Sequence, residues 1–120
     1  MAIIKAVNSK SSIARAINYI TKAEKTEKKL ISGIDCNPET AIDEMKATKE
    51  LYDKNDGRQY AHFIQSFNPS DDISPEKAHE IGKEFIEKND KFKSHEIVLA
   101  THKDKNHIHN HFILNSVSYE

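Results

Sequence analysis

Cysteine, arginine and long apolar runs are all scarce in this sequence. Cys36 is the one cysteine, so no internal disulfide can form, and a reducing compartment is expected. No apolar run approaches the roughly 20 residues needed to span a bilayer. The opening segment, MAIIKAVNSK, turns polar too soon for a signal peptide. We therefore expect a cytoplasmic protein without a membrane span.

Positive charge is also limited. The net charge is −1 at neutral pH, and Arg15 and Arg58 are the only arginines. Overall charge therefore gives no sign of nucleic-acid binding, which would need a local basic surface. One candidate for phosphate contacts is the segment 22–29, where four lysines are interleaved with Glu24 and Glu27. An ordinary solvated surface is the alternative interpretation of this segment.

What the chain does contain is a regular alternation of strand-like and helix-like segments. With 120 residues, 37% of them apolar and 31% charged, it suits one small globular domain over residues 1–120. Apolar periodicity and turn signals predict the order β-α-β-α-β-α-β-β. The predicted strands are 2–7, 28–34, 59–67, 95–101 and 107–117, separated by three helices. Because the last two strands form a hairpin, we expect an α+β fold: a mainly antiparallel sheet with the helices packed on one face and a metal site on the other.

Capping residues mark the start of each predicted helix. Ser12, or the serine before it, can cap the first helix. Its buried stripe follows at helical spacing: Ile13, Ala16, Ile17 and Ile20. Asn37 can cap the second helix, with Pro38 at its first position. Ser74 and the proline after it begin the third helix in the same way, and this helix has the clearest pattern of the three.

Four of the seven histidines lie within the segment THKDKNHIHNHFILNSV. Side chains two apart point to the same face of a strand, so His109 and His111 should project together, with Phe112 and Leu114 on the other face. The turn would bring His102, at the end of the preceding strand, beside them. Three neutral imidazoles suit a divalent metal ion and leave open positions for substrate oxygens. A structural zinc site is disfavoured, because such sites usually use cysteine thiolates.

Two further residues of this segment could support the three histidines. His107 lies on the same face but in or beside the turn, so it is a reserve ligand. Asp104 could orient an imidazole from outside the ligand set, or it could simply form the turn. The sequence alone leaves both possibilities for Asp104 open.

A covalent cleavage mechanism would also need a nucleophile. Tyr19 lies about 110° around its predicted helix from the centre of the buried stripe, so its hydroxyl can stay exposed. An amphipathic tyrosine at the edge of the core is the alternative. Tyr52, at a helix end, and Tyr60, in a strand, fit structural roles better.

Three segments, in this order, carry a resemblance to a known family: AINYITKAEKT, YAHFIQSFNPSD and HKDKNHIHNHFILNSV. Together they resemble the relaxase/mobilisation nuclease family of conjugative and mobilisable elements, which belongs to the HUH endonucleases. In related replication initiators and single-tyrosine transposases the tyrosine follows the histidines, whereas here it precedes them. By this resemblance Tyr19 matches the nucleophile, and His102, His109 and His111 match the metal ligands. Family domains are usually longer, which implies a relaxase-like nuclease domain truncated at its C-terminal end.

The resemblance implies a DNA relaxase acting in plasmid or mobile-element mobilisation. Such an enzyme nicks single-stranded DNA at an origin of transfer through a 5′-phosphotyrosine intermediate. The implied cofactor is Mg²⁺ or Mn²⁺, and Zn²⁺, Ni²⁺ or Co²⁺ would also suit imidazole ligands. Relaxosome accessory proteins and a coupling protein are implied as further partners.

The tyrosine hydroxyl must lose its proton as it attacks, and the sequence leaves the identity of the accepting base open. His62, on the strand 59–67, could be that base or could orient the site, and a structural sheet histidine is the alternative. Two other functions compete with the relaxase. One is a metal-dependent phosphodiesterase or ribonuclease that uses water, and the other is an inactive fragment that binds metal and DNA.

Overall fold

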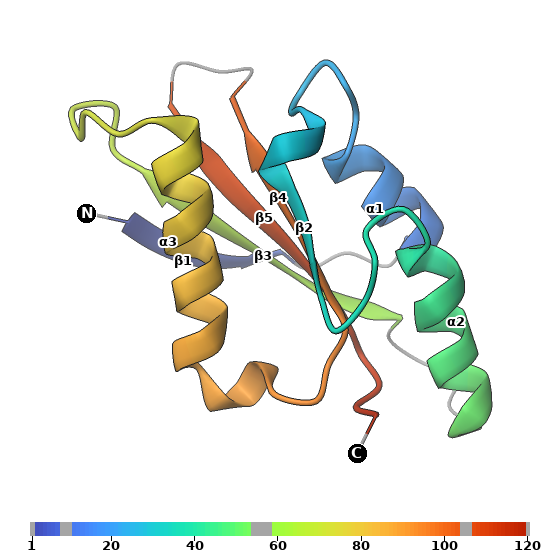
Figure 1. Cartoon of the computed structure of the whole chain (residues 1–120). Coiled ribbons are helices and arrows are strands. Elements are labelled where there is room, and N and C mark those ends of the chain that lie inside the picture. The colour runs from blue at the N-terminus through green and yellow to red at the C-terminus, as the bar shows by residue number, and fades with distance from the viewer. Residues whose placement is uncertain (1, 8–10, 54–58, 104–106, 120) are drawn as a thin grey trace.

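The computed structural model describes residues 2–7, 11–53, 59–103 and 107–119. Strands and helices follow one another in the predicted order (Figure 1). The strands are β1 (Ala2–Val7), β2 (Ile31–Ile34), β3 (Tyr60–Phe67), β4 (Ile97–His102) and β5 (His109–Asn115). The helices are α1 (Ile13–Ile20), α2 (Ala41–Leu51) and α3 (Pro75–Lys88). None of the helices in the described ranges is long and apolar enough to cross a lipid bilayer.

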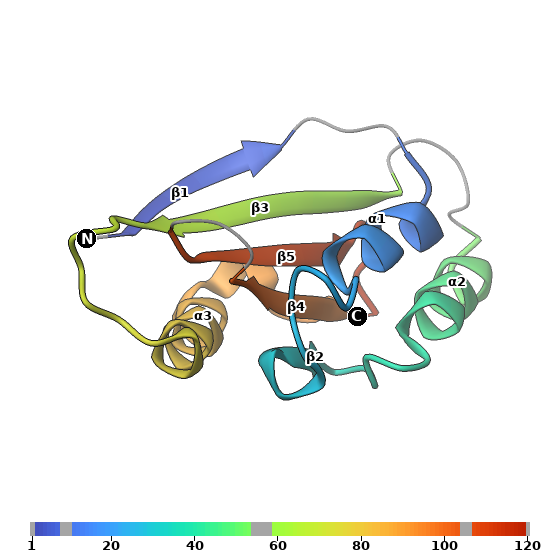
Figure 2. The ribbon, with the colours of Figure 1, turned by 90° about the horizontal axis from the view of Figure 1, so that it is seen from above.

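The strands form one antiparallel sheet in the order β1-β3-β5-β4-β2. Figure 2 shows β1 and β2 at opposite edges of this sheet. β5 therefore lies in the middle, between β3 and its hairpin partner β4. The predicted α+β class, the antiparallel sheet and the final hairpin are confirmed.

One detail of the predicted arrangement is corrected, because helices cover both faces of the sheet. α1 and α2 lie on one side of the sheet and α3 on the other (Figure 1). Ile113 packs in a cluster with α1 and α2, whereas its neighbour Phe112 packs in a cluster with α3. The central strands carry apolar side chains on both faces, so both faces need cover. His111 points the same way as Ile113, and the histidines therefore share their face with α1, which carries Tyr19.

The starts of α1 and α3 follow the prediction, and that of α2 does not. The hydroxyls of Ser12 and Ser74 each accept a bond from the backbone N–H three residues on, at 3.1 Å. α2 begins at Ala41 rather than at Pro38. The Asn37 side chain accepts a bond from the backbone two residues on, so it stabilises a turn ahead of the helix rather than the helix itself.

Candidate metal centre and nucleophile

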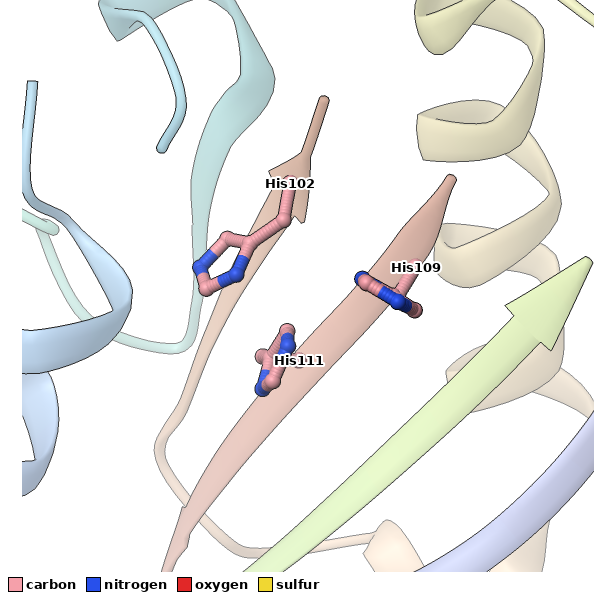
Figure 3. A group of neighbouring side chains, drawn as sticks. All are labelled: His102, His109 and His111. Carbon is pink, nitrogen blue, oxygen red and sulfur yellow. The ribbon is translucent and has the colours of Figure 1, made fainter. Parts of the chain in front are cut away.

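Three histidines from the β4–β5 hairpin meet on one face of the sheet. His102, the last residue of β4, pairs in register with His109, the first residue of β5, and His111 follows two residues later. One possible ligand atom from each residue lies within 4.8 Å of the others. Figure 3 shows the three rings gathered over the hairpin. The rings of His102 and His111 are stacked, with centroids 3.9 Å apart. The structure thus brings together all three predicted ligands in a group that could hold a metal ion.

The surroundings of these rings suit metal binding. His102 Nε2 lies 2.8 Å from the backbone carbonyl oxygen of Ile20. A carbonyl oxygen only accepts, so Nε2 carries the proton and Nδ1 carries the lone pair that a metal needs. Burial, together with the neighbouring His102 and His62, lowers the pKa of His111 to about 2. A neutral imidazole is the form that binds metal, so this donor set fits a divalent ion.

Two more histidines touch the group of three. Nε2 of His62 lies 3.0 Å from Nδ1 of His111, and burial lowers the pKa of His62 to about 4. Nε2 of His107 lies 3.0 Å from Nε2 of His109. His62 and His107 therefore each contact one histidine of the group of three. The predicted contribution of residue 104, an aspartate, lies outside the described residues.

Tyr19 lies on the flank of α1 beside the histidines. The buried stripe of α1 is the predicted one, which leaves Tyr19 45% exposed. The centroid of its ring is 6.3 Å from that of His102. Ile20, the next residue, accepts the bond from His102, so the tyrosine helix and the histidine group are directly connected.

The lysine-rich segment 22–29 divides into two parts. The Nζ atoms of Lys22 and Lys25 lie 5.9 and 5.1 Å from the centroid of the Tyr19 ring. Lys28 and Lys29 form ion pairs with glutamates, at 3.1 and 3.0 Å. Two lysine ammonium groups therefore lie close to the tyrosine ring, although the net charge of the chain is near zero.

Comparison with known proteins places the chain in a family. The family model described as "Relaxase: MobA/VirD2-like, nuclease domain" matches residues 19–120, a range that starts at Tyr19 and contains the three histidines. The chain belongs to this relaxase family.

Two relatives illustrate the similarity and its extent. This relaxase-family chain is 42% identical to Protein rlx of Staphylococcus aureus over 120 residues, which cover 100% of the chain and 36% of that protein. It is 40% identical to the group II intron-interrupted relaxase LtrB of Lactococcus lactis subsp. cremoris over 96 residues, which cover 80% of the chain and 17% of LtrB. The chain thus spans only about a third or less of the length of these curated relatives. No solved structure was found to match it.

A row of buried polar side chains, which was not predicted from the sequence, lies directly behind the histidines. Thr101 and Asn110 are both fully buried, at 0% exposure, and point toward α3. His79 of α3, which has no place in the histidine motif, bonds to Thr101. One signal in the sequence could have indicated this row. Asn110 interrupts the apolar alternation of Ile108, Phe112 and Leu114 in the same strand.

Proposed function

We propose that this chain is the nuclease domain of a DNA relaxase, which nicks one strand of single-stranded DNA at an origin of transfer when a plasmid or mobile element is mobilised. The observation that carries this proposal is the meeting of Tyr19 with the three-histidine group on one face of the sheet. Family membership supports the same activity. Relaxosome accessory proteins and a coupling protein are the further partners that we propose.

In this proposal Tyr19 is the nucleophile. Its Oη forms a bond to the scissile phosphorus while the bond from phosphorus to the 3′ oxygen breaks. The tyrosine proton passes to a base, and the leaving oxygen takes up a proton to become a 3′ hydroxyl. The 5′ phosphate stays on Tyr19, and the reverse of the same exchange rejoins the strand.

The other side chains are proposed to bind the metal ion and to orient its ligands. We propose His102, His109 and His111 as ligands of Mg²⁺ or Mn²⁺, with Zn²⁺, Ni²⁺ and Co²⁺ as further ions that imidazoles suit. When bound, the ion polarises the scissile phosphate and neutralises its developing charge. His62 contacts His111, which supports an orienting role for His62 rather than that of the base. If Nδ1–H of His111 donates to His62, then Nε2 of His111 carries the lone pair for the metal.

Lys22 and Lys25 are proposed to contact DNA phosphates next to the attacking oxygen. Their ammonium groups lie on the same side of α1 as the Tyr19 ring. Phosphate neutralisation by lysine supplies sequence-independent affinity. A local pair of this kind explains how a chain with a net charge of −1 can hold a polyanion.

The test is to incubate the chain with random single-stranded oligonucleotides and Mn²⁺ and to search by mass spectrometry for a DNA adduct on Tyr19. The adduct should form in the wild type and in Tyr52→Phe, a matched control at another partly exposed tyrosine. Tyr19→Phe should abolish it, because the nucleophilic oxygen is removed while the ring remains.

An undiminished adduct in Tyr19→Phe would refute the tyrosine mechanism. Cleavage without any adduct would favour the phosphodiesterase or ribonuclease that uses water. Metal binding without cleavage would favour the inactive metal- and DNA-binding fragment.

A further inference from the structure

A chain of buried and partly buried hydrogen bonds crosses the back of the β4–β5 hairpin, on the face opposite the histidines. It links Ser32 of β2, His79 of α3, Thr101 of β4, Asn110 of β5 and Gln65 of β3. The four successive contacts measure 2.6, 2.8, 2.5 and 2.9 Å. The chain therefore joins four strands of the sheet to the helix that covers this face.

The middle of this chain adjoins the proposed metal ligands. Thr101 directly precedes His102, and Asn110 lies between His109 and His111. Thr101 and Asn110 also pair with each other in register. Side chains alternate along a strand, so the hydrogen-bond chain and the histidines lie on opposite faces of the same short stretch of backbone. A change in how Thr101 and Asn110 meet must therefore move the backbone that carries the histidines.

The direction of each bond in the chain is determined by one backbone carbonyl. The carbonyl oxygen of Ala78 only accepts, so Nδ2 of Asn110, 2.7 Å away, must face it. Oδ1 of Asn110 then faces Thr101, whose hydroxyl must donate. The Thr101 oxygen in turn accepts from Nδ1–H of His79, and Nε2 of His79 accepts from the Ser32 hydroxyl. Burial lowers the pKa of His79 to about 4, which agrees with a neutral ring in this role.

Close packing also restricts Asn110. A Cβ atom at Gly82 of α3 would lie 2.7 Å from Nδ2 of Asn110, so the helix backbone lies directly against this amide. Burying so many polar groups carries a desolvation cost that apolar side chains would avoid. A fully satisfied network offsets that cost and selects one arrangement of the elements that it joins. The need for one fixed arrangement is greatest where ligand positions must be set within fractions of an ångström.

We propose that Thr101 and Asn110 are positioning residues for the three histidines. The bond between them fixes the separation and twist of β4 and β5 where these strands carry His102, His109 and His111. The proposal rests on the proposed function in one respect only, namely that the three histidines bind a metal ion.

The test uses Co²⁺ as the probe and needs no DNA. Its visible absorption reports both affinity and ligand geometry, and the titration is made at a temperature where every variant is folded. Thr101→Val removes the hydroxyl at nearly constant volume and should weaken Co²⁺ binding about tenfold, the lower end of the range for partners outside the ligand set. Thr101→Ser keeps the hydroxyl and should bind within about twofold of the wild type.

A matched control separates positioning from general stability. Ile97→Val removes a buried methyl group from the same strand and the same face, at the end of β4 far from the histidines. It should lower the melting temperature but leave the Co²⁺ affinity and spectrum unchanged. The positioning role is overturned if Thr101→Val behaves like Ile97→Val, with reduced thermal stability and wild-type Co²⁺ binding.

If Thr101→Val does not fold, Gln65→Met replaces it, because that variant releases Asn110 from the other side. Co²⁺ binding at least threefold weaker in Gln65→Met supports the proposal, and wild-type binding overturns it. A wild-type chain that binds no Co²⁺ would overturn the positioning role, whereas normal Co²⁺ binding without any strand cleavage would overturn only the proposed function.

Discussion

Replacing Gly82 by alanine should destabilise the fold, even though alanine is the better helix former. Gly82 lies inside α3, and an added Cβ would be 2.7 Å from Nδ2 of Asn110 and 3.2 Å from Cδ2 of Leu99. The leucine can shift by a few tenths of an ångström. The amide cannot shift freely, because it already bonds to Ala78 and Gln65. Either α3 moves outward or Asn110 loses a bond.

The expected size of this effect comes from three contributions. Alanine in place of glycine stabilises an exposed helix position by about 1 kcal/mol. Overpacking of a tight core costs about 1–3 kcal/mol. A buried amide that loses its partner costs about 1–3 kcal/mol more. The net loss in the free energy of unfolding should therefore be about 1–5 kcal/mol, which corresponds to a melting temperature lower by at least about 4 °C in a domain of this size.

Circular dichroism melts and urea titrations measure this difference. Lys83, the next residue of α3, is exposed and supplies the control, because Lys83→Ala should be more stable than Lys83→Gly by about 1 kcal/mol. If Gly82→Ala is as stable as the wild type while the two Lys83 variants differ as expected, the close approach of α3 to Asn110 is not what excludes a side chain.

Two further predictions concern protons and salt. Because burial lowers the pKa of His79 from 6.5 to about 4, the unfolded chain binds this proton at a higher pH than the folded chain. The contribution of His79 to the free energy of unfolding should thus be fully present above pH 6.5. It should fall toward pH 4, by up to about 1.4 kcal/mol per pH unit. Urea titrations at several pH values should show a shallower fall in His79→Gln, and an unchanged slope would contradict the assignment. Lys22→Gln and Lys25→Gln should each weaken binding of a single-stranded oligonucleotide and reduce the slope of log affinity against log salt by about 0.7. Fluorescence anisotropy measures both, with Lys28→Gln as the ion-paired control; equal effects in all three variants would contradict a specific role for the pair beside Tyr19.

The order of the elements followed from the sequence because its signals are local. Serine caps, apolar stripes and turn residues act within a few positions of one another, and they located α1 and α3 correctly. The start of α2 was misplaced because Asn37 can support either a helix or a turn. The faces covered by the helices were not predictable in the same way. β4 begins Ile-Val-Leu-Ala, a continuous apolar run that is buried on both sides and so gives no sign of which helix covers which face.

The candidate site shows the same division between local and distant signals. The three histidines come from one hairpin, so strand alternation was enough to predict that they meet. The distance between Tyr19 and the hairpin depends on how α1 packs on the sheet, which only the resemblance could anticipate. The ion pairs of Lys28 and Lys29 depend on glutamates from other parts of the chain. The bond between His79 and Thr101 also joins residues distant in sequence, whereas Asn110 belongs to the same hairpin as Thr101.

The hydrogen bond from His102 to the carbonyl of Ile20 has a thermodynamic consequence. It satisfies one of the carbonyls left over in the last turn of α1, and it also sets the tautomer of a proposed ligand. Coupling between two sites is reciprocal, so whatever steadies His102 must steady the end of α1 by the same factor. A DNA strand held covalently on Tyr19 would then change the affinity of the histidines for their ion, and the ion would change the equilibrium between nicked and rejoined DNA to the same extent. If the tyrosine and the histidines have the proposed roles, this bond is one route by which the covalent state of Tyr19 and the occupancy of the histidines are linked.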